Sequence, residues 1–133
     1  MNIIQNKLNE IFETKITFYK FDLLNNKITM NLEKIENGIR SNHKLELEKI
    51  STAYFINNTS NKRKNIFEPE EDDYLELTSL NILEKSVLFR IESDIEQWLN
   101  KYCGMGNLIL EIWSNIIILE VQIIRLDEKE FVL

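Results

Sequence analysis

The clearest pattern of apolar and polar positions lies between residues 107 and 126. Leucine, isoleucine and valine alternate there with polar residues, and Ser114-Asn115 interrupts the alternation. Period-two alternation around a short polar break predicts an antiparallel hairpin. We expect this hairpin to form the centre of a sheet with one buried face. The residues predicted to share the buried face are Leu108, Leu110, Ile112, Ile117, Leu119, Val121 and Ile123.

Two turn signals earlier in the chain divide shorter stretches of alternation. Residues 15–35 predict a hairpin that turns at Asn25-Asn26, because asparagine tolerates left-handed backbone angles. Asn37-Gly38 predicts a second tight turn directly after this hairpin. Antiparallel neighbours joined by short turns are therefore expected throughout the first third of the chain.

The middle of the chain predicts three more strands. Residues 44–57 predict one strand with a β-bulge, because the alternation slips by one residue after Lys49. Residues 57–73 predict a polar loop in which basic and acidic residues are segregated. Alternation then predicts separate strands over residues 74–83 and 85–92.

Helical spacing is confined to two segments. Residues 2–12 predict a short amphipathic helix packed on the sheet, with Ile4, Leu8, Ile11 and Phe12 on its apolar face. Ser93-Asp94-Ile95-Glu96 is a capping-box pattern and predicts a helix that ends near Gly104. The predicted apolar face of this second helix consists of Ile95, Trp98, Leu99 and Tyr102.

Together these elements predict an α+β fold in a single domain over residues 1–133. The expected architecture is one twisted, curled antiparallel sheet of about six to seven strands. A short N-terminal helix and one helix before the C-terminal hairpin complete it.

Charge and cysteine content narrow the classes of function. The net charge of −6 disfavours nucleic acids and anionic membranes as partners, and it suits a basic protein. The single cysteine, Cys103, excludes an intrachain disulfide. Residues 107–126 could span a bilayer by length, but their three charged residues argue against a membrane helix. Without an apolar leader at the N-terminus, we expect a cytoplasmic protein.

The densest acidic run, residues 68–73, suggests a partner-binding site. Such a run is typical of a solvated loop, and it lacks the central glycine of a calcium-binding EF-hand loop. It also suits the basic groove of a protein partner. Glutamates on the polar faces of the predicted strands could add to the negative electrostatic potential of this loop; they are Glu46, Glu48, Glu76, Glu111 and Glu120. A partly exposed Trp113 could anchor an interface. The residues predicted to bind the partner are Glu68, Glu70, Glu71, Asp72, Asp73, Glu111 and Trp113.

No sequence pattern predicts an enzyme. The only histidine, His43, falls in a predicted polar turn, and the only cysteine lies far away at the predicted end of a helix. Nothing else suggests that these two residues form a catalytic dyad. Gly104-Met105-Gly106 follows a predicted helix instead of preceding one, so it does not predict a phosphate-binding loop. No cofactor and no metal are expected.

Three segments in a fixed order carry a resemblance to a known family. They are Glu48–Phe55, Tyr74–Leu80, and Asn107–Ile112 continuing into Ile116–Leu126. Over roughly residues 14–127 the chain resembles the YxiG-like group of small proteins of Gram-positive bacteria. Members of such groups tend to be encoded near polymorphic-toxin loci, so the resemblance implies an immunity or accessory role. It implies no catalytic residues.

The leading hypothesis is a non-enzymatic protein that binds another protein, such as an immunity protein that neutralises a basic toxin domain. The alternative is a small-molecule or lipid-binding domain with a cavity inside the curled sheet. That cavity would be lined by Phe18, Phe21, Tyr54, Phe55, Phe89 and Trp98. A third hypothesis is self-association through the edge of the terminal hairpin.

Overall fold

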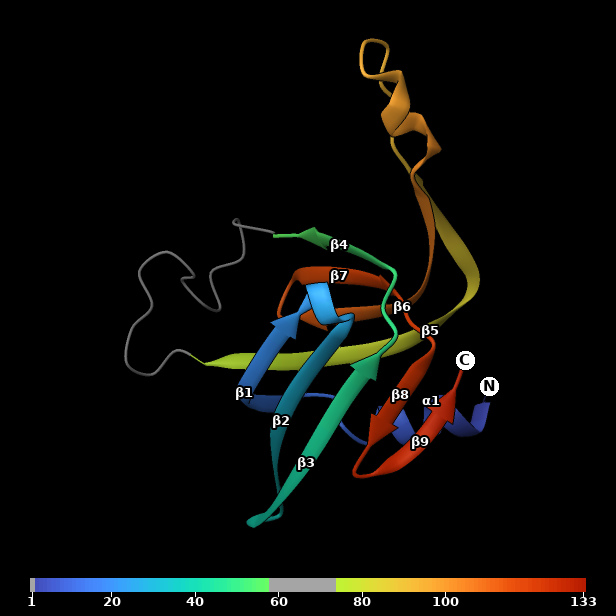
Figure 1. The fold of residues 1–133 in the computed structure, drawn as a ribbon. Helices are drawn as coiled ribbons and strands as arrows, with labels where there is room; N and C mark the ends of the chain where they lie inside the picture. The colour runs from blue at the N-terminus through green and yellow to red at the C-terminus, as the bar shows by residue number, and fades with distance from the viewer. Residues whose placement is uncertain (1, 58–73) are drawn as a thin grey trace.

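The computed structural model describes residues 2–57 and 74–133 (Figure 1). These residues form one α-helix, two short 3-10 helices and nine strands. The helices are α1 (Asn2–Asn9), η1 (Leu23–Asn25) and η2 (Gln97–Lys101). The strands are β1 (Thr14–Asp22), β2 (Lys27–Glu36), β3 (Ile39–Glu48), β4 (Thr52–Ile56), β5 (Leu75–Arg90), β6 (Cys103–Ile112), β7 (Asn115–Glu120), β8 (Ile123–Leu126) and β9 (Lys129–Val132).

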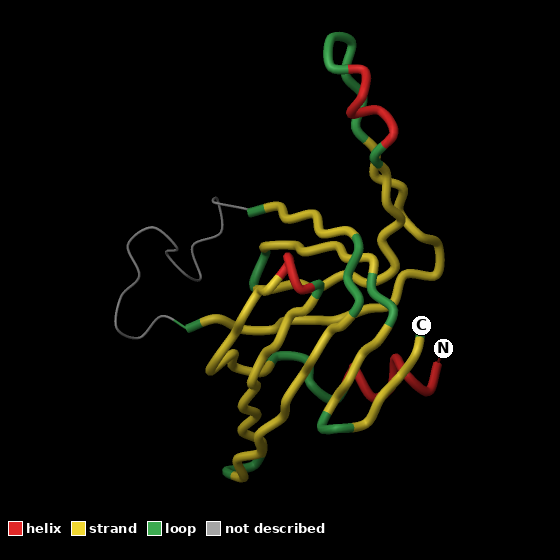
Figure 2. The backbone as a smooth tube through the Cα atoms, viewed as in Figure 1, coloured by secondary structure: helices red, strands yellow, loops and turns green. Residues whose placement is uncertain are grey.

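All nine strands belong to one sheet in the order β4-β7-β6-β5-β1-β2-β3-β8-β9, and neighbours are antiparallel. The sheet curls strongly without closing (Figure 2). Residues 115–126 bridge its two halves, because β7 pairs with β6 while β8 pairs with β3. Between these strands, the amide of Val121 donates to the side chain of Asn107 at 2.9 Å. The predicted curled antiparallel sheet is therefore confirmed.

The buried apolar residues form one core cluster, and α1 packs against β5. The predicted N-terminal helix forms but ends at Asn9 instead of residue 12. Leu8 in α1 and Ile11 in the turn after it are both fully buried. Gln5 fixes the helix to the sheet, because its Oε1 accepts a hydrogen bond from the amide of Ile82 at 2.8 Å. Its Nε2 donates to the carbonyl of Leu80 at 3.0 Å.

The predicted C-terminal hairpin forms, with a shorter second strand. Six of the seven predicted core positions are buried, from Leu108 to Val121. The turn lies at Trp113-Ser114, because Ile112 pairs with Asn115. The prediction that the second strand continues to Ile123 is wrong. After Glu120 the chain leaves β6 for β3, and Ile124 takes the buried position.

The predicted number of six to seven strands is also wrong, because the structure has nine. Residues 44–57 do not form one bulged strand. Lys49 adopts a left-handed backbone (φ 56°) that ends β3, and β4 then pairs with β7 at the far end of the sheet. Conversely, the two strands predicted over residues 74–92 are one long strand, β5, with shifts in register against β6. Strand β9 was not predicted.

The predicted second α-helix is absent, and only the five-residue η2 forms there. The capping contact itself is present, since the Ser93 hydroxyl accepts a hydrogen bond from the amide of Glu96 at 3.0 Å. An amphipathic helix is stabilised mainly by burying its apolar face, and Trp98 and Tyr102 find no core beneath them. Gly104 lies within β6 and ends no helix. Among the described residues, no helix has the length and apolar character needed to cross a membrane.

Candidate functional site

The most conspicuous surface is a hairpin that projects from the sheet (Figures 1 and 2). We call residues 83–107 the arm: the outer half of β5, the connection through η2, and the first half of β6. Regular pairing of β5 with β6 is interrupted between Ile82 and Val87, where the register shifts. The arm leaves the body of the sheet at this irregularity. No residue between 83 and 103 is buried.

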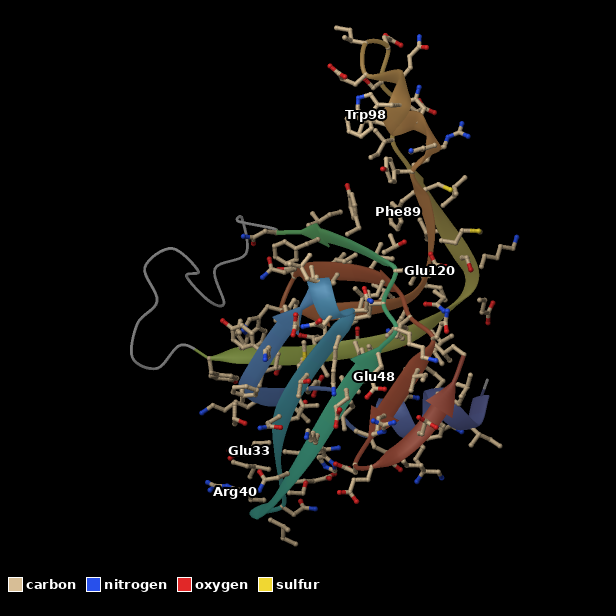
Figure 3. All side chains as sticks on the ribbon, in the orientation of Figure 1. Glu33, Arg40, Glu48, Phe89, Trp98 and Glu120 are labelled. Atoms are coloured by element: carbon tan, nitrogen blue, oxygen red, sulfur yellow. The ribbon has the colours of Figure 1, made fainter. Side chains whose placement is uncertain are left out.

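Large apolar side chains nevertheless follow the whole length of the arm. Ile95 is 89% exposed and Trp98 is 60% exposed. Figure 3 places Trp98 near the tip, far from the body of the sheet. Its ring meets Tyr102 edge-on, with centroids 6.3 Å apart, and its Nε1 donates to Glu96 at 2.9 Å. The other exposed apolar residues of the arm are Val87, Leu88, Ile91 and Met105.

Charges at the tip of the arm are mostly acidic. Glu92, Asp94 and Glu96 lie within five residues that contain no basic side chain. Arg90, below them, lies 3.2 Å from the carboxylate of Glu92. The tip therefore combines exposed aromatic side chains with a local negative charge.

Strand β4 supports the base of the arm. Tyr54 on β4 stacks on Phe89 of the arm, with ring centroids 4.8 Å apart. Glu120 at the end of β7 joins three strands, because its Oε1 accepts hydrogen bonds from the Thr52 hydroxyl at 3.1 Å and the Met105 amide at 2.8 Å. A cavity of about 410 Å³ lies in the corner between β4 and the arm. The arm is thus attached firmly at its base and exposed beyond it.

The structure describes two of the seven residues predicted to bind the partner, Glu111 and Trp113. Glu68, Glu70, Glu71, Asp72 and Asp73 lie outside the described residues. Glu111 lies on the outer face of β6 and accepts a hydrogen bond from the Ser79 hydroxyl at 3.1 Å. Trp113 is half-buried in the β6–β7 turn, where its Nε1 donates to the carbonyl of Tyr74 at 3.0 Å.

The remaining strand-face glutamates also have partners within the chain. Glu46 lies 2.8 Å from Lys27, and Glu48 lies 2.6 Å from Arg125. The hydrogen bond from the Lys27 ammonium holds the pKa of the Glu46 carboxyl below its usual value. Glu76 accepts a hydrogen bond from Thr78 at 3.0 Å. These carboxylates therefore contribute to contacts within the sheet.

An apolar groove lies at the other side of β4. It has a volume of about 450 Å³ and is continuous in its lining with a second hollow of about 350 Å³, since both share Phe21, Phe55 and Ile117. Of the aromatic residues predicted to line a cavity, Phe21 and Phe55 do so here, and Tyr54 and Phe89 line the corner beside the arm. Trp98 and Phe18 line neither.

The only histidine and the only cysteine lie in strands. His43 lies within β3 and not in a turn, whereas Cys103 is exposed at the start of β6. Both edges of the β6–β7 hairpin are occupied, by β5 and β4, so it offers no free edge for self-association. No group of three or more histidine, cysteine or acidic residues in the described part of the chain is arranged to hold a metal.

A family model described as YxiG-like protein matches residues 4–131. The chain belongs to the YxiG-like family. The match extends beyond the resemblance seen in the sequence and takes in most of α1 and β9. No curated protein and no solved structure matches the chain.

The sequence of this YxiG-like chain did not predict that the arm projects from the sheet and exposes its apolar side chains. Its apolar positions Ile95, Trp98 and Tyr102 have the spacing of a helix that packs on a core. One signal in the sequence was the pair Gly104 and Gly106, because residues without a side chain let β6 pack closely against β4 and β7 at the base of the arm. A Cβ at Gly106 would lie 2.5 Å from the side chain of Ile118.

Proposed function

We propose that the chain binds another protein through the arm, and that the partner is a toxin domain that it neutralises as an immunity protein. One observation carries the proposal: the segment from residue 83 to 103 has no buried residue although it is rich in large apolar side chains. An isolated two-stranded hairpin is marginally stable in water. Docking in a partner would bury the apolar side chains of the arm.

The composition of the arm suits a protein interface. Tryptophan and tyrosine are enriched among the residues that dominate binding energy, and Trp98 and Tyr102 lie together near the tip. Glu96 accepts a hydrogen bond from Trp98, and Glu92 and Asp94 lie close by in the sequence, while the ammonium of Lys101 lies 5.2 Å from the Tyr102 ring. A cleft with a basic rim would complement this arrangement and speed association. We propose that the active site of a basic toxin domain supplies this cleft.

The test is co-expression and pull-down with the toxin domains encoded nearby, followed by titration of any complex. In the complex, Trp98→Ala should weaken binding by about 30-fold, which corresponds to about 2 kcal/mol for a dominant interface residue. Leu24→Ala is the matched control, because Leu24 is 98% exposed on η1, away from the arm. Failure to form a complex with any toxin domain would overturn the proposal. Equal binding by both variants would overturn the role of the arm.

The second candidate function is binding of a small apolar molecule or lipid chain in the groove beside β4. The observation that favours it is the elongated apolar lining around Phe21, Phe55 and Ile117. Pockets of several hundred Å³ lined by aromatic and aliphatic side chains are typical of ligand sites.

Titration with a fluorescent fatty acid tests this candidate. A saturable increase in fluorescence that is lost in Ile117→Asp and kept in Ile39→Asp would support it. Ile39 is 71% exposed at the start of β3 and serves as the control. No saturable binding to the folded protein would exclude a lipid chain.

A further inference from the structure

Three polar side chains outside the arm form a continuous chain of hydrogen bonds in the first half of β3. The hydroxyl of Ser41 lies 3.3 Å from Nε2 of His43, and Nδ1 of His43 lies 2.7 Å from Oδ2 of Asp127. Ser41 and His43 are two residues apart on one strand, so both side chains project from the same face. Asp127 directly follows β8, which pairs with β3.

Backbone contacts fix the carboxylate of Asp127. Its Oδ1 accepts a hydrogen bond from the amide of Lys44 at 2.8 Å, and its own amide donates to the carbonyl of Lys44 at 2.9 Å. An ionised carboxylate can only accept hydrogen bonds, so Nδ1 of His43 carries the proton. In the neutral ring Nε2 can accept from the hydroxyl of Ser41 at 3.3 Å, and the carbonyl of Lys34 is a second, longer acceptor for that hydroxyl at 3.5 Å. This is the tautomer that a histidine needs to act as general base toward a serine.

The surroundings leave room for a substrate. A hollow of about 500 Å³ is lined by His43 and Asp127 together with polar groups that include Asn42 and Thr17, whereas Ser41 borders it only through its neighbour Asn42. Backbone groups alternate in direction along a strand, and Lys44 directs its amide and carbonyl toward Asp127. The amide of Asn42 therefore points to the same edge of β3, beyond the residues that pair with β8. A donor directly after a nucleophilic serine is suitably placed for an oxyanion.

We propose that Ser41, His43 and Asp127 form a nucleophilic triad that takes an acyl or phosphoryl group from an activated ester. This inference is independent of the arm and departs from the expectation of a chain without enzymatic activity. Ser41 and His43 are the catalytic residues, and Asp127 is a positioning residue that acts through the imidazole ring.

With an ester such as p-nitrophenyl acetate, the proposed reaction has two steps, acylation of Ser41 and hydrolysis of the acyl-serine. Oγ of Ser41 forms a bond to the carbonyl carbon while its proton passes to Nε2 of His43. The bond to the p-nitrophenyl oxygen breaks with its electron pair, His43 passes the proton from Nε2 to that oxygen, and p-nitrophenol leaves the neutral imidazole behind. Water, deprotonated by His43, then hydrolyses the acetyl-serine to acetate and restores the hydroxyl of Ser41.

Diisopropyl fluorophosphate is the decisive probe, because it leaves a stable phosphoryl group on a nucleophilic serine and releases fluoride. We expect mass spectrometry of the full-length folded protein to find the adduct on Ser41. Ser41→Ala should abolish this adduct, and His43→Gln should slow its formation at least about 100-fold. Ser51→Ala, which removes an exposed serine before β4, should leave labelling of Ser41 unchanged.

Two variants of Asp127 distinguish positioning from a structural role. Asp127 has a left-handed backbone (φ 50°) that asparagine tolerates well, and asparagine keeps an oxygen for the Lys44 amide. A structural role would therefore be preserved by Asp127→Asn. The triad predicts the opposite: Asp127→Asn loses labelling, whereas Asp127→Glu recovers part of it. Folded protein whose Ser41 stays unlabelled, or reacts no faster than Ser51, overturns the proposal.

Discussion

Tyr54 and Phe89 stack almost face to face, with their ring planes 17° apart, and so join strand β4 to the base of the arm. Offset stacking contributes about 0.5–1.5 kcal/mol beyond the burial of area. Phe89→Ala should therefore lower the free energy of unfolding and increase amide hydrogen exchange in β4. Tyr19→Ala is the control, because Tyr19 meets Phe21 edge-on in β1 instead. Unchanged exchange in β4 would show that the stack does not hold the arm.

Gly104 should be required because no side chain fits at its position, and Gly38 should be required because its backbone is left-handed. A Cβ at Gly104 would overlap the side chain of Thr52, whereas Gly38 has φ +77° and open space around it. Gly104→Ala should cost about 1–3 kcal/mol through overpacking, and Gly38→Ala about 1–2 kcal/mol through a left-handed backbone.

Replacement by asparagine separates these two causes, because asparagine tolerates left-handed angles but is larger than alanine. Chemical denaturation should show that Gly38→Asn is milder than Gly38→Ala. Gly104→Asn should be at least as harmful as Gly104→Ala. The reverse order at either position would refute the assigned cause.

Removal of the Glu120 carboxylate should loosen the junction of β4, β6 and β7. Glu120→Ala leaves the Met105 amide and the Thr52 hydroxyl without their acceptor, which should cost about 1–3 kcal/mol. Glu120→Gln keeps one carbonyl oxygen and should cost less. Glu84→Ala on the exposed part of β5 removes the same charge and should change thermal stability little.

The Glu46–Lys27 pair should make stability depend on pH in the acidic range. Lys27 lowers the pKa of Glu46 from its usual 4.5 in the folded state. The carboxylate therefore contributes stability above that value, and the contribution is lost as the pH falls through 4.5 toward the lower folded pKa.

Glu46→Gln should accordingly cost about 0.5–1 kcal/mol at pH 7, and the difference from the native chain should shrink below pH 4.5. Urea denaturation across pH 3–7 measures it. Glu36→Gln is the control, because Glu36 is 72% exposed and lies 3.9 Å from Lys34. A difference that stays constant down to pH 3 would contradict the assignment.

Local patterns in the sequence predicted most of the sheet. Asn37-Gly38 forms the expected turn, with positive φ at both residues, and the alternation from Leu108 to Ile112 gave the buried face of β6 correctly. Such features depend only on neighbours along the chain. The family resemblance noted from three strand segments is likewise confirmed.

Errors arose where distant parts of the chain decide the structure. The slip in alternation at Lys49 looks like a bulge, but it is where the chain leaves β8 to pair with β7. The helical spacing around Trp98 had no surface to pack against. His43 and Asp127 are 84 residues apart, and only the pairing of β3 with β8 brings them together.

Residues 115–126 complete two separate halves of the sheet, since β7 pairs with β6 and β8 pairs with β3. During translation, β3 would therefore leave the ribosome long before the strand that flanks it exists. Its backbone donors and acceptors would remain satisfied by water on one side until β8 has been synthesised. A chain of this topology gains its cooperative stability late, and contacts so distant in sequence favour slow folding.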